Sequence, residues 1–453
     1  MKTAVFVCGE CGNESPKWLG RCPACQAWNS LMEDSRFVSG GGRRPAAASV
    51  PPSEARTVEA YLGGAALRRF TTGMASMDRV LGGGILPGMG VLIGGEPGIG
   101  KSTLLLQCAA GLARGTGKIL YVTGEESGAQ VALRARRIGV GTGEILLLPE
   151  HSLERVLEAA ERLHPAVLLI DSIQTLACAA LDSPAGSLAQ VRECAARLLE
   201  HAKRADTALF LIGHVTKEGT LAGPKALEHL VDTVLYFDGD GALAHRMVRC
   251  VKNRFGPAGE AAVFEMAEAG LRCIENPSAL FMGHPRRGVP GSVVFCSLEG
   301  SLPFLVEIQA LVAAAGPGSA RRSATGIDPV RVSMLLAILE KRAGIALASE
   351  EVFVNAAGGV RLSEVAADLP ACCAVASSAL NRPARPDTVA FGEVGLTGEV
   401  RAVARAAERL REAHRMGFTR AVLPRPNLKD LPKDLPIEAV GASTISEAVE
   451  SLL

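Results

Sequence analysis

The chain has 453 residues, of which 48% are hydrophobic and 21% are charged. At about 150 residues per domain, this length predicts two or three domains of ordinary globular composition. The formal net charge is +1, so nucleic-acid binding would have to come from a local basic surface and not from the chain as a whole.

The sequence predicts neither a membrane span nor a secretion signal. Its longest uncharged stretches are shorter than the roughly 18 to 20 residues that a span needs, and the apolar run after the N-terminus ends at Glu10. Eight of the twelve cysteines lie singly or paired in apolar segments, where reduced thiols behave as small hydrophobes. We therefore expect a cytoplasmic protein in a reducing compartment.

The N-terminal segment carries two C-x-x-C pairs, CGEC and CPAC, separated by ten residues. Four thiolates at this spacing can surround one tetrahedral Zn²⁺, in a segment too short to fold around an apolar core. The predicted metal ligands are Cys8, Cys11, Cys22 and Cys25. Two disulfides or a redox pair are the alternative, but no secretory or βαβ pattern surrounds the motif. Trp18 and Trp28 lie in or beside this module and form either its small core or a surface for a partner.

A strand, a glycine-rich turn and a helix are predicted by VLIGGEPGIGKSTLLLQC. The turn satisfies the pattern G-x-x-x-x-G-K-[ST], whose backbone N–H groups cradle phosphates. Lys101 would meet the β- and γ-phosphates and Ser102 would hold Mg²⁺, so the expected ligands are ATP and Mg²⁺. The residues assigned to the nucleotide are Gly95, Glu96, Pro97, Gly98, Ile99, Gly100, Lys101, Ser102, Thr103 and, from a later strand, Asp171.

Further apolar runs follow at the spacing of an α/β domain: KILYVTGEE, EILLLP, AVLLIDSIQT, ALFLIGHVT and VDTVLYFDGD. They alternate with helical stretches such as LERVLEAAERL, which predicts a mostly parallel sheet covered on both faces. Functional groups should then gather at the carboxyl ends of the strands. Asp171 has the position of a Walker B carboxylate, and Glu125 or Glu126 could polarise the attacking water, the other being a charge at a helix start. His214 is a candidate sensor of the γ-phosphate, although a lone histidine is usually structural.

Three later segments carry features suited to phosphates. The loop TKEGTLAGPKALEH contains Lys217 and Lys225, and together with CAALDSPAGSLAQ it could line a channel for a single strand of DNA. Plain surface loops have the same composition, so both interpretations stay open. The segment CVKNRFG contributes Lys252 and Arg254, about 150 residues after the P-loop. A basic β-turn would explain its phenylalanine and glycine but not the two charges.

Six segments carry a family resemblance: CGECGNESPKWLGRCPACQAWNS, GEPGIGKST, YVTGEES, LLIDSIQT, GHVTKEGTLAGPKALEHLVDTVLYFDGD and KNRFG. They resemble, in order and over essentially the whole chain, the bacterial RadA (Sms) family of DNA repair ATPases, whose motor is similar to RecA. One small departure is Glu96, where relatives usually carry aspartate.

The resemblance implies a homo-oligomer, expected to be a hexameric ring, in which Lys252 and Arg254 complete the ATP site of a neighbouring copy. It also implies a DNA-dependent ATPase and helicase of homologous recombination. Such a motor binds single-stranded and branched DNA, works with a RecA-type recombinase and drives branch migration of its joint molecules. The residues expected near DNA are Lys217, Lys225, Lys252 and Arg254.

From about Pro285 the chain resembles the C-terminal domain of the same family, which is similar to the protease domain of Lon. Proteolysis of that type needs a serine nucleophile and an activating lysine. Aligned by eye, these positions fall near Ala366 and Ala407, and the nearby Ser363 and Ser377 have no lysine at a suitable spacing. We therefore expect a proteolytically inactive, ring-forming scaffold that presents arginines to duplex DNA. The candidates, each of which is otherwise a solvated charge, are Arg286, Arg287, Arg321 and Arg322.

The predicted fold is α/β in four parts. They are a zinc ribbon-like C4 module at 1–38, a linker at 39–56, a RecA-like ATPase domain with a mostly parallel sheet at 57–275, and a Lon protease-like α/β domain at 276–453. Two other functions fit part of the pattern. An ATP-dependent protease would need the missing dyad, and a nucleotide-gated scaffold similar to KaiC-type proteins would need neither zinc knuckles nor DNA-stimulated hydrolysis.

Overall fold

The computed structural model describes residues 6–8, 14–15, 17–23, 28, 31–33, 57, 68–141, 143–214, 224–239, 245–282, 288–316 and 320–453. The chain divides into two units, Met1–Cys273 and Ile274–Leu453, each with its own internal packing.

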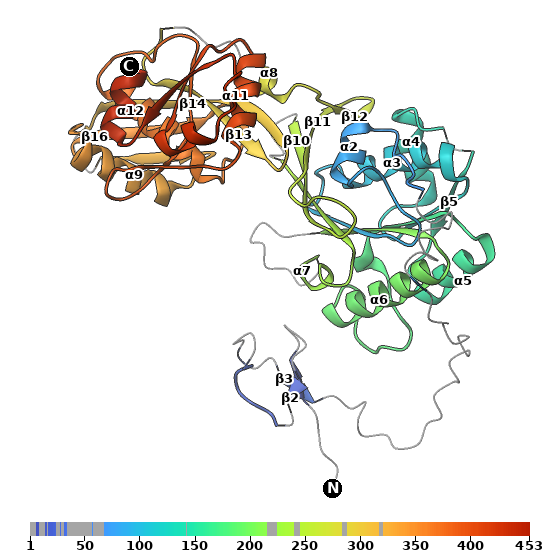
Figure 1. Ribbon diagram of the computed structural model, residues 1–453. Coiled ribbons are helices and arrows are strands. Elements are labelled where there is room, and N and C mark those ends of the chain that lie inside the picture. Colours follow the sequence, from blue (N-terminus) through green and yellow to red (C-terminus); the bar gives the residue numbers. More distant parts are fainter. Residues whose placement is uncertain are drawn as a thin grey trace. The chain divides into compact units, whose positions relative to one another are not determined.

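A nine-stranded sheet forms the centre of the first unit (Figure 1). Its strands are β4 (Gly90–Gly95), β5 (Ile119–Thr123), β6 (Ile145–Pro149), β7 (Val167–Asp171), β8 (Ala208–His214), β9 (Thr233–Asp238), β10 (His245–Asn253), β11 (Ala261–Ala267) and β12 (Gly270–Cys273). Their order is β12-β11-β10-β9-β4-β8-β7-β5-β6. Strands β4 to β9 are parallel, and β10 to β12 extend the β9 edge in antiparallel fashion. The predicted, mostly parallel sheet is confirmed.

Helices cover both faces of this sheet, as Figure 1 shows. They are α2 (Ala75–Val80), α3 (Lys101–Thr116), α4 (Gly128–Arg137), α5 (Leu153–Leu163), α6 (Leu188–Arg204) and α7 (Pro224–Leu227), with a short 3₁₀ turn at Ile173–Thr175. Val91 and Ile93 pack into the core beneath α2, α3 and α4, whereas Leu92 between them packs into the core beneath α5 and α6. This alternation explains why the strands are apolar on both faces.

Serine caps fix where three of these helices begin. Ser152 accepts the backbone N–H of Arg155, and LERVLEAAERL forms α5 residue for residue as predicted. Ser127 and Ser187 cap α4 and α6 in the same way. Each cap satisfies a backbone donor that would otherwise lack a partner at the start of the helix.

The N-terminal module has a small three-stranded sheet. Its strands, β1 (Phe6–Cys8), β2 (Glu14–Ser15) and β3 (Leu31–Glu33), are ordered β2-β1-β3. Cys8 and Cys22 are buried together, with Phe6 packed against them. Cys11 and Cys25 lie outside the described residues, so the full predicted ligand set is not in view.

The second unit is built on a mixed seven-stranded sheet in the order β15-β16-β14-β13-β17-β20-β21. The strands are β13 (Ser292–Glu299), β14 (Leu302–Ala314), β15 (Arg322–Thr325), β16 (Glu350–Ala356), β17 (Thr388–Ala390), β20 (Arg420–Pro424) and β21 (Glu438–Ala442), beside a two-stranded pair, β18 (Glu393–Val394) and β19 (Val400–Arg401). The helices are α8 (Pro277–Phe281), α9 (Pro329–Arg342), α10 (Asp368–Ala379), α11 (Ala406–Arg415) and α12 (Ile445–Leu452). Helix α10 is buried along almost its whole length, which makes it the centre of this unit's core.

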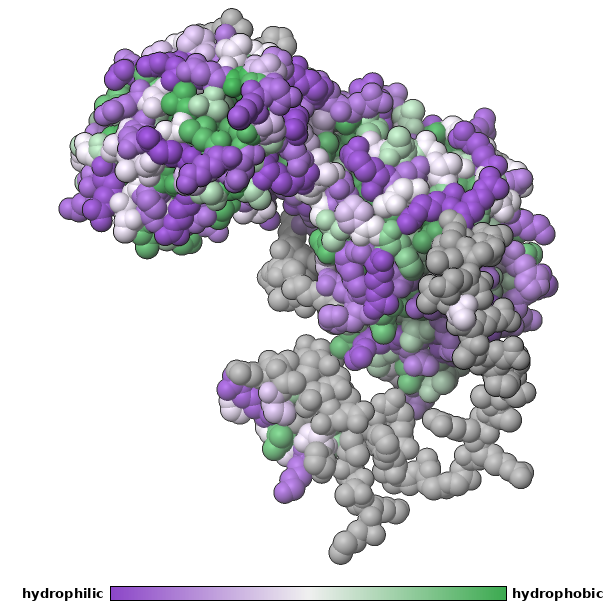
Figure 2. All heavy atoms as spheres, in the orientation of Figure 1, coloured by the Kyte–Doolittle hydropathy of each residue, from purple (hydrophilic) through white to green (hydrophobic). Residues whose placement is uncertain are grey.

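Polar side chains cover most of the visible face of each unit, and apolar ones are scattered among them (Figure 2). Within the described part of the chain, no helix is long and apolar enough to cross a membrane.

Candidate active site

The glycine-rich turn between β4 and α3 has the backbone geometry that only glycine adopts easily. Gly98 and Gly100 have φ values of +76° and +114°, and a Cβ at Gly95 would lie 2.6 Å from the carbonyl oxygen of Phe237. The turn is exposed from Glu96 to Gly98, and its far side is held where Arg246 Nε donates to the Ile99 carbonyl at 3.2 Å. The N-terminus of α3, with its unpaired backbone N–H groups, is therefore open to phosphate oxygens.

Lys101, the first residue of α3, is 3% exposed. Its Nζ donates to the carbonyls of Gly95 and Glu96, both at 2.8 Å, and lies 3.1 Å from His214 Nδ1. Burial lowers the pKa of Lys101 to about 8, against the opposing effect of the Asp171, Glu125 and Glu96 carboxylates. A phosphate could replace these acceptors and would bring negative charge into direct contact with the ammonium group.

Asp171, at the end of β7, has one carboxylate oxygen in use and one unpaired. Tyr121 Oη donates to its Oδ2 at 2.5 Å, whereas its buried Oδ1 has no hydrogen-bond partner in the described structure. Burial, together with the charge of Asp171 and the hydrogen bond to it, holds the pKa of Tyr121 well above its ordinary value, so the phenol keeps its proton. A buried carboxylate oxygen without a donor fits Mg²⁺ or one of its water ligands, and Ser102 at the start of α3 offers the hydroxyl.

The two glutamates after β5 have different partners. Glu125 Oε1 accepts from Ser172 Oγ at 2.6 Å and lies 2.8 Å from His214 Nε2. Burial alone would raise the pKa of Glu125, but the hydrogen bonds from Ser172 and His214 outweigh it, so the pKa is lowered. Glu126 instead forms an ion pair with Arg134 of α4. Glu125 therefore faces the site, whereas Glu126 is paired with a helix beside it.

The KNRFG segment lies toward the amino-terminal ends of the parallel strands, whereas the P-loop lies at their carboxyl ends. Lys252 and Asn253 pair with the first residues of β9, and Thr233 there is opposite Val91, near the start of β4. The P-loop follows Gly95, four residues further along β4, or about 13 Å at strand spacing. In its own chain, this segment is thus remote from Lys101.

Both cations of this segment have partners within their own chain. The expectation that a basic β-turn would leave the two charges without an explanation is therefore wrong. Lys252 Nζ donates to the carbonyls of Glu228 and Val231, at 2.6 and 2.8 Å. Arg254 Nη1 lies 3.4 Å from Asp232 Oδ1, but its side chain remains 54% exposed. Burial and then the charge of Arg254 lower the pKa of Lys252. Lys252 is therefore held by carbonyls of its own chain, and Arg254 is the more accessible cation.

The residues predicted to contact DNA differ in whether they are described. Lys217 lies outside the described residues, as do Arg286 and Arg287, and Lys225 falls in α7 without a described side chain. Arg321 and Arg322 are exposed at the edge strand β15. The loop CAALDSPAGSLAQ, which precedes α6 and runs into it, is held by hydrogen bonds to Gln190. Its Nε2 donates to the carbonyls at positions 178, 181 and 183.

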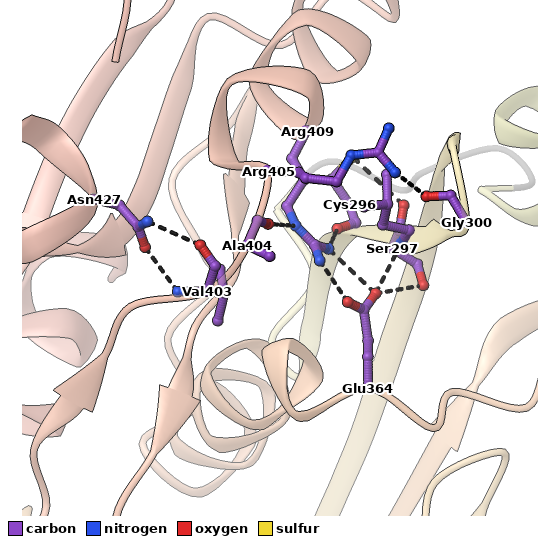
Figure 3. A network of polar contacts seen from close by, with 10 residues as sticks. Cys296, Ser297, Gly300, Glu364, Val403, Ala404, Arg405, Arg409 and Asn427 are labelled. Carbon is purple, nitrogen blue, oxygen red and sulfur yellow. Dashed lines mark hydrogen bonds and ion pairs between the residues drawn. The ribbon is translucent and has the colours of Figure 1, made fainter. Parts of the chain in front are cut away.

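The second unit has a buried ion pair near the two positions aligned with the protease dyad. Arg409 of α11 is 3% exposed and donates to the Cys296 carbonyl at 2.6 Å and to both carboxylate oxygens of Glu364 (Figure 3). Ala366 is buried, and Ser377 Oγ is fully buried and accepts the backbone N–H of Gly291. The sequence has no lysine between positions 342 and 428. A serine–lysine pair is therefore absent from this part of the chain.

Family models match the three folded parts in turn. The match over 6–33 is to a rubredoxin metal binding domain, that over 68–220 to an AAA domain, and that over 331–427 to subunit ChlI of Mg-chelatase. The first spans all four cysteines of the predicted metal site, and the second contains the P-loop, Glu125, Asp171 and His214.

Curated relatives match over the full length of the chain. DNA repair protein RadA of Halalkalibacterium halodurans is 46% identical, over 100% of this chain and 99% of its own. The proteins of the same name from Pseudomonas aeruginosa and Bacillus subtilis are 47% and 45% identical, each over 99% of this chain and 98% of theirs. The chain belongs to the RadA family. The predicted resemblance is confirmed, and so is the predicted fold class of zinc ribbon-like module, P-loop core and C-terminal α/β domain.

Sequence reasoning missed three residues of this site: Ser172, Tyr121 and Arg246. Ser172 follows the predicted Walker B carboxylate directly, so its neighbourhood could have been inferred from the strand end. Tyr121 and Arg246 act across strands, and no local pattern in the sequence indicates their partners.

Proposed function

We propose that the chain is a DNA-dependent ATPase that works as a helicase in DNA repair and homologous recombination. The observation that carries the proposal is the line of contacts from Lys101 through His214 to Glu125, beside the unpaired oxygen of Asp171. This arrangement combines a phosphate-binding cation, a metal-binding carboxylate and a base at one edge of a parallel sheet.

Hydrolysis would begin with ATP phosphates on the N-terminus of α3. Lys101 would leave the carbonyls of Gly95 and Glu96 for the β- and γ-phosphates. Mg²⁺, held by Ser102 and Asp171, supplies charge neutralisation when it is bound. Glu125 would accept a proton from water as the water oxygen bonds to the γ-phosphorus and the bond to the β–γ bridging oxygen breaks, which yields ADP and phosphate.

His214 connects binding to hydrolysis in this scheme. A charged Lys101 can only donate, so Nδ1 of His214 accepts and Nε2 carries the hydrogen that it donates to Glu125. When Lys101 moves to phosphate, the ring loses one partner and can turn so that its Nε2–H donates to the γ-phosphate instead of to Glu125. Binding of the nucleotide would thereby change the hydrogen bonding of Glu125.

Lys252 and Arg254 would serve the nucleotide of a neighbouring copy in a ring, which we expect to be hexameric. Their place at the opposite ends of the strands from Lys101, and the exposure of Arg254, support this role. A ring of identical, head-to-tail interfaces brings such distant surfaces together at each site.

The substrates would be single-stranded and branched DNA in the cytoplasm. The relatives' name, DNA repair protein RadA, supports a DNA substrate. The motor would then drive branch migration of joint molecules made by a RecA-type recombinase, with Lys217 and Lys225 near the strand. The four cysteines Cys8, Cys11, Cys22 and Cys25 would bind Zn²⁺ in the N-terminal module.

Displacement of a labelled strand from forked DNA tests the proposal. The wild-type chain should displace the strand with ATP, and Lys101→Ala and Arg254→Ala should fail. Arg272→Ala is a matched control, because Arg272 is an exposed arginine of β12 paired only with Glu265 among the described residues. ATP hydrolysis without any strand displacement by the wild type would contradict the helicase and favour a DNA-bound switch.

A further inference from the structure

Both tryptophans of the chain are exposed on the N-terminal module. Trp18 is 54% exposed and Trp28 is 73% exposed. Among the described residues of the module, the buried cluster consists of Cys8 and Cys22 with Phe6 packed against them, and the indoles are not part of it. Two large aromatic side chains in water, on a module this small, indicate a binding surface.

The two indoles are close to one another and one is held in place. Trp18 Cη2 and Trp28 Cζ3 lie 3.8 and 4.0 Å from the position that a Cβ would take at Gly20. The Arg21 guanidinium carbon lies 5.6 Å from the centroid of the Trp28 ring, and Arg21 and Trp28 also form a β-bridge. A cation–π contact of this kind keeps the ring oriented while most of its surface remains open.

The stretch of sequence that carries both indoles contains no acidic residue. Lys17 and Arg21 are the only charged residues between positions 16 and 32. Both are exposed, and Ser15 Oγ, bonded to the backbone N–H and carbonyl of Lys17, fixes the chain just before Trp18. Open aromatic faces beside cations are what a single-stranded nucleic acid needs, because its bases can stack and its phosphates can pair. A duplex hides its base faces and would not use the indoles.

We propose that Trp18, Trp28, Arg21 and Lys17 form a stacking platform for single-stranded nucleic acid, with bases on the indoles and phosphates on the cations. The proposal rests on the proposed function, since it assigns a contact to the same DNA strand. It places that contact on the N-terminal module, apart from the loops of the ATPase unit.

Tryptophan fluorescence tests the platform directly, because the full chain contains only these two tryptophans. A single-stranded oligothymidylate should quench the emission saturably, and a blunt duplex of equal length should not. Trp18→Ala and Trp28→Ala should each weaken binding of the oligothymidylate, followed by fluorescence anisotropy of a dye on the DNA. The expected loss is about 5- to 150-fold, the range given by about 1–3 kcal/mol of stacking per base.

Controls separate the platform from the fold of the module and from the motor. Leu19→Ala removes an exposed but non-aromatic neighbour and should leave affinity unchanged. Trp28→Phe should restore most of the binding lost in Trp28→Ala, because phenylalanine can still stack. Each variant should retain its metal content and its ATP hydrolysis without DNA.

Three outcomes would overturn the platform. Suppose that the full chain binds the oligothymidylate, but the DNA does not quench the tryptophan emission and the tryptophan variants keep the wild-type affinity. The platform is then wrong while the proposed function stands. If the chain binds no single strand and DNA does not stimulate its ATP hydrolysis, both proposals fail. If a purified recombinase quenches the emission and the oligothymidylate does not, the surface binds a protein.

Discussion

His214 Nε2 lies 2.8 Å from the carboxylate of Glu125, which joins the end of β8 to the segment after β5. The other ring nitrogen contacts Lys101, so one imidazole connects the cation of the P-loop to the candidate base. Strand β7 lies between β5 and β8 in the sheet, and Ser172 at its end adds a second donor to Glu125. Glu125 is therefore positioned by Ser172 after β7 and His214 of β8, and His214 links it to Lys101 after β4.

Glu125→Gln should lower the rate of ATP hydrolysis by about 10²- to 10⁴-fold while nucleotide affinity is retained, because only the proton acceptor is removed. Glu126→Gln is the matched control. It breaks the ion pair with Arg134 and should leave most of the rate intact. Steady-state hydrolysis and binding of a fluorescent nucleotide measure the two effects. Equal losses of rate in both variants would rule out the assignment of Glu125 as base.

Nucleotide affinity should fall as pH rises through about 8, since the pKa of Lys101 in the free site has about that value. A bound phosphate raises this pKa, so above pH 8 Lys101 must take up a proton when the nucleotide binds. Affinity should be flat below that pH and drop by up to about tenfold per pH unit above it. Calorimetric titration with ADP in two buffers of different ionisation enthalpy would show the proton uptake. Lys101→Arg stays charged and should lack this dependence, whereas proton uptake that persists in Lys101→Arg would assign it to another group.

Arg409→Met should destabilise the second unit by about 3–5 kcal/mol, because it leaves the half-buried Glu364 without its cation. The guanidinium also lies 5.7 Å from the centroid of the Phe391 ring. Arg411→Met changes an exposed arginine of the same helix and should stay within about 0.5 kcal/mol of the wild type. Denaturant unfolding measures both. Equal unfolding midpoints for the two variants would show that the pair contributes little.

The sequence predicted most of the fold and the P-loop, because each depends on a local pattern. The apolar runs became β5 to β9, and Asp171 lies at a carboxyl strand end as expected. The missing protease dyad, expected from Ala366 and Ala407, stays a prediction.

Other features required contacts between distant residues. The separate roles of Glu125 and Glu126 depend on Ser172, which lies 47 residues beyond Glu125, and on the position of Arg134 on α4. The in-chain partners of Lys252 depend on the register of β10 against β9 and on the carbonyls that precede β9. The exposure of Trp18 and Trp28 was left open because composition does not show which side chains fill so small a core.

The central claim is that ATP is hydrolysed at a site shared by two copies of the chain. Its most direct test is the rate of ATP hydrolysis in equal mixtures of Lys101→Ala and Arg254→Ala subunits, each inactive alone. A shared site predicts that the mixture regains activity at roughly a quarter of the interfaces, because each intact site needs one subunit of each kind in the right order. A mixture no more active than the two variants measured separately would contradict the account.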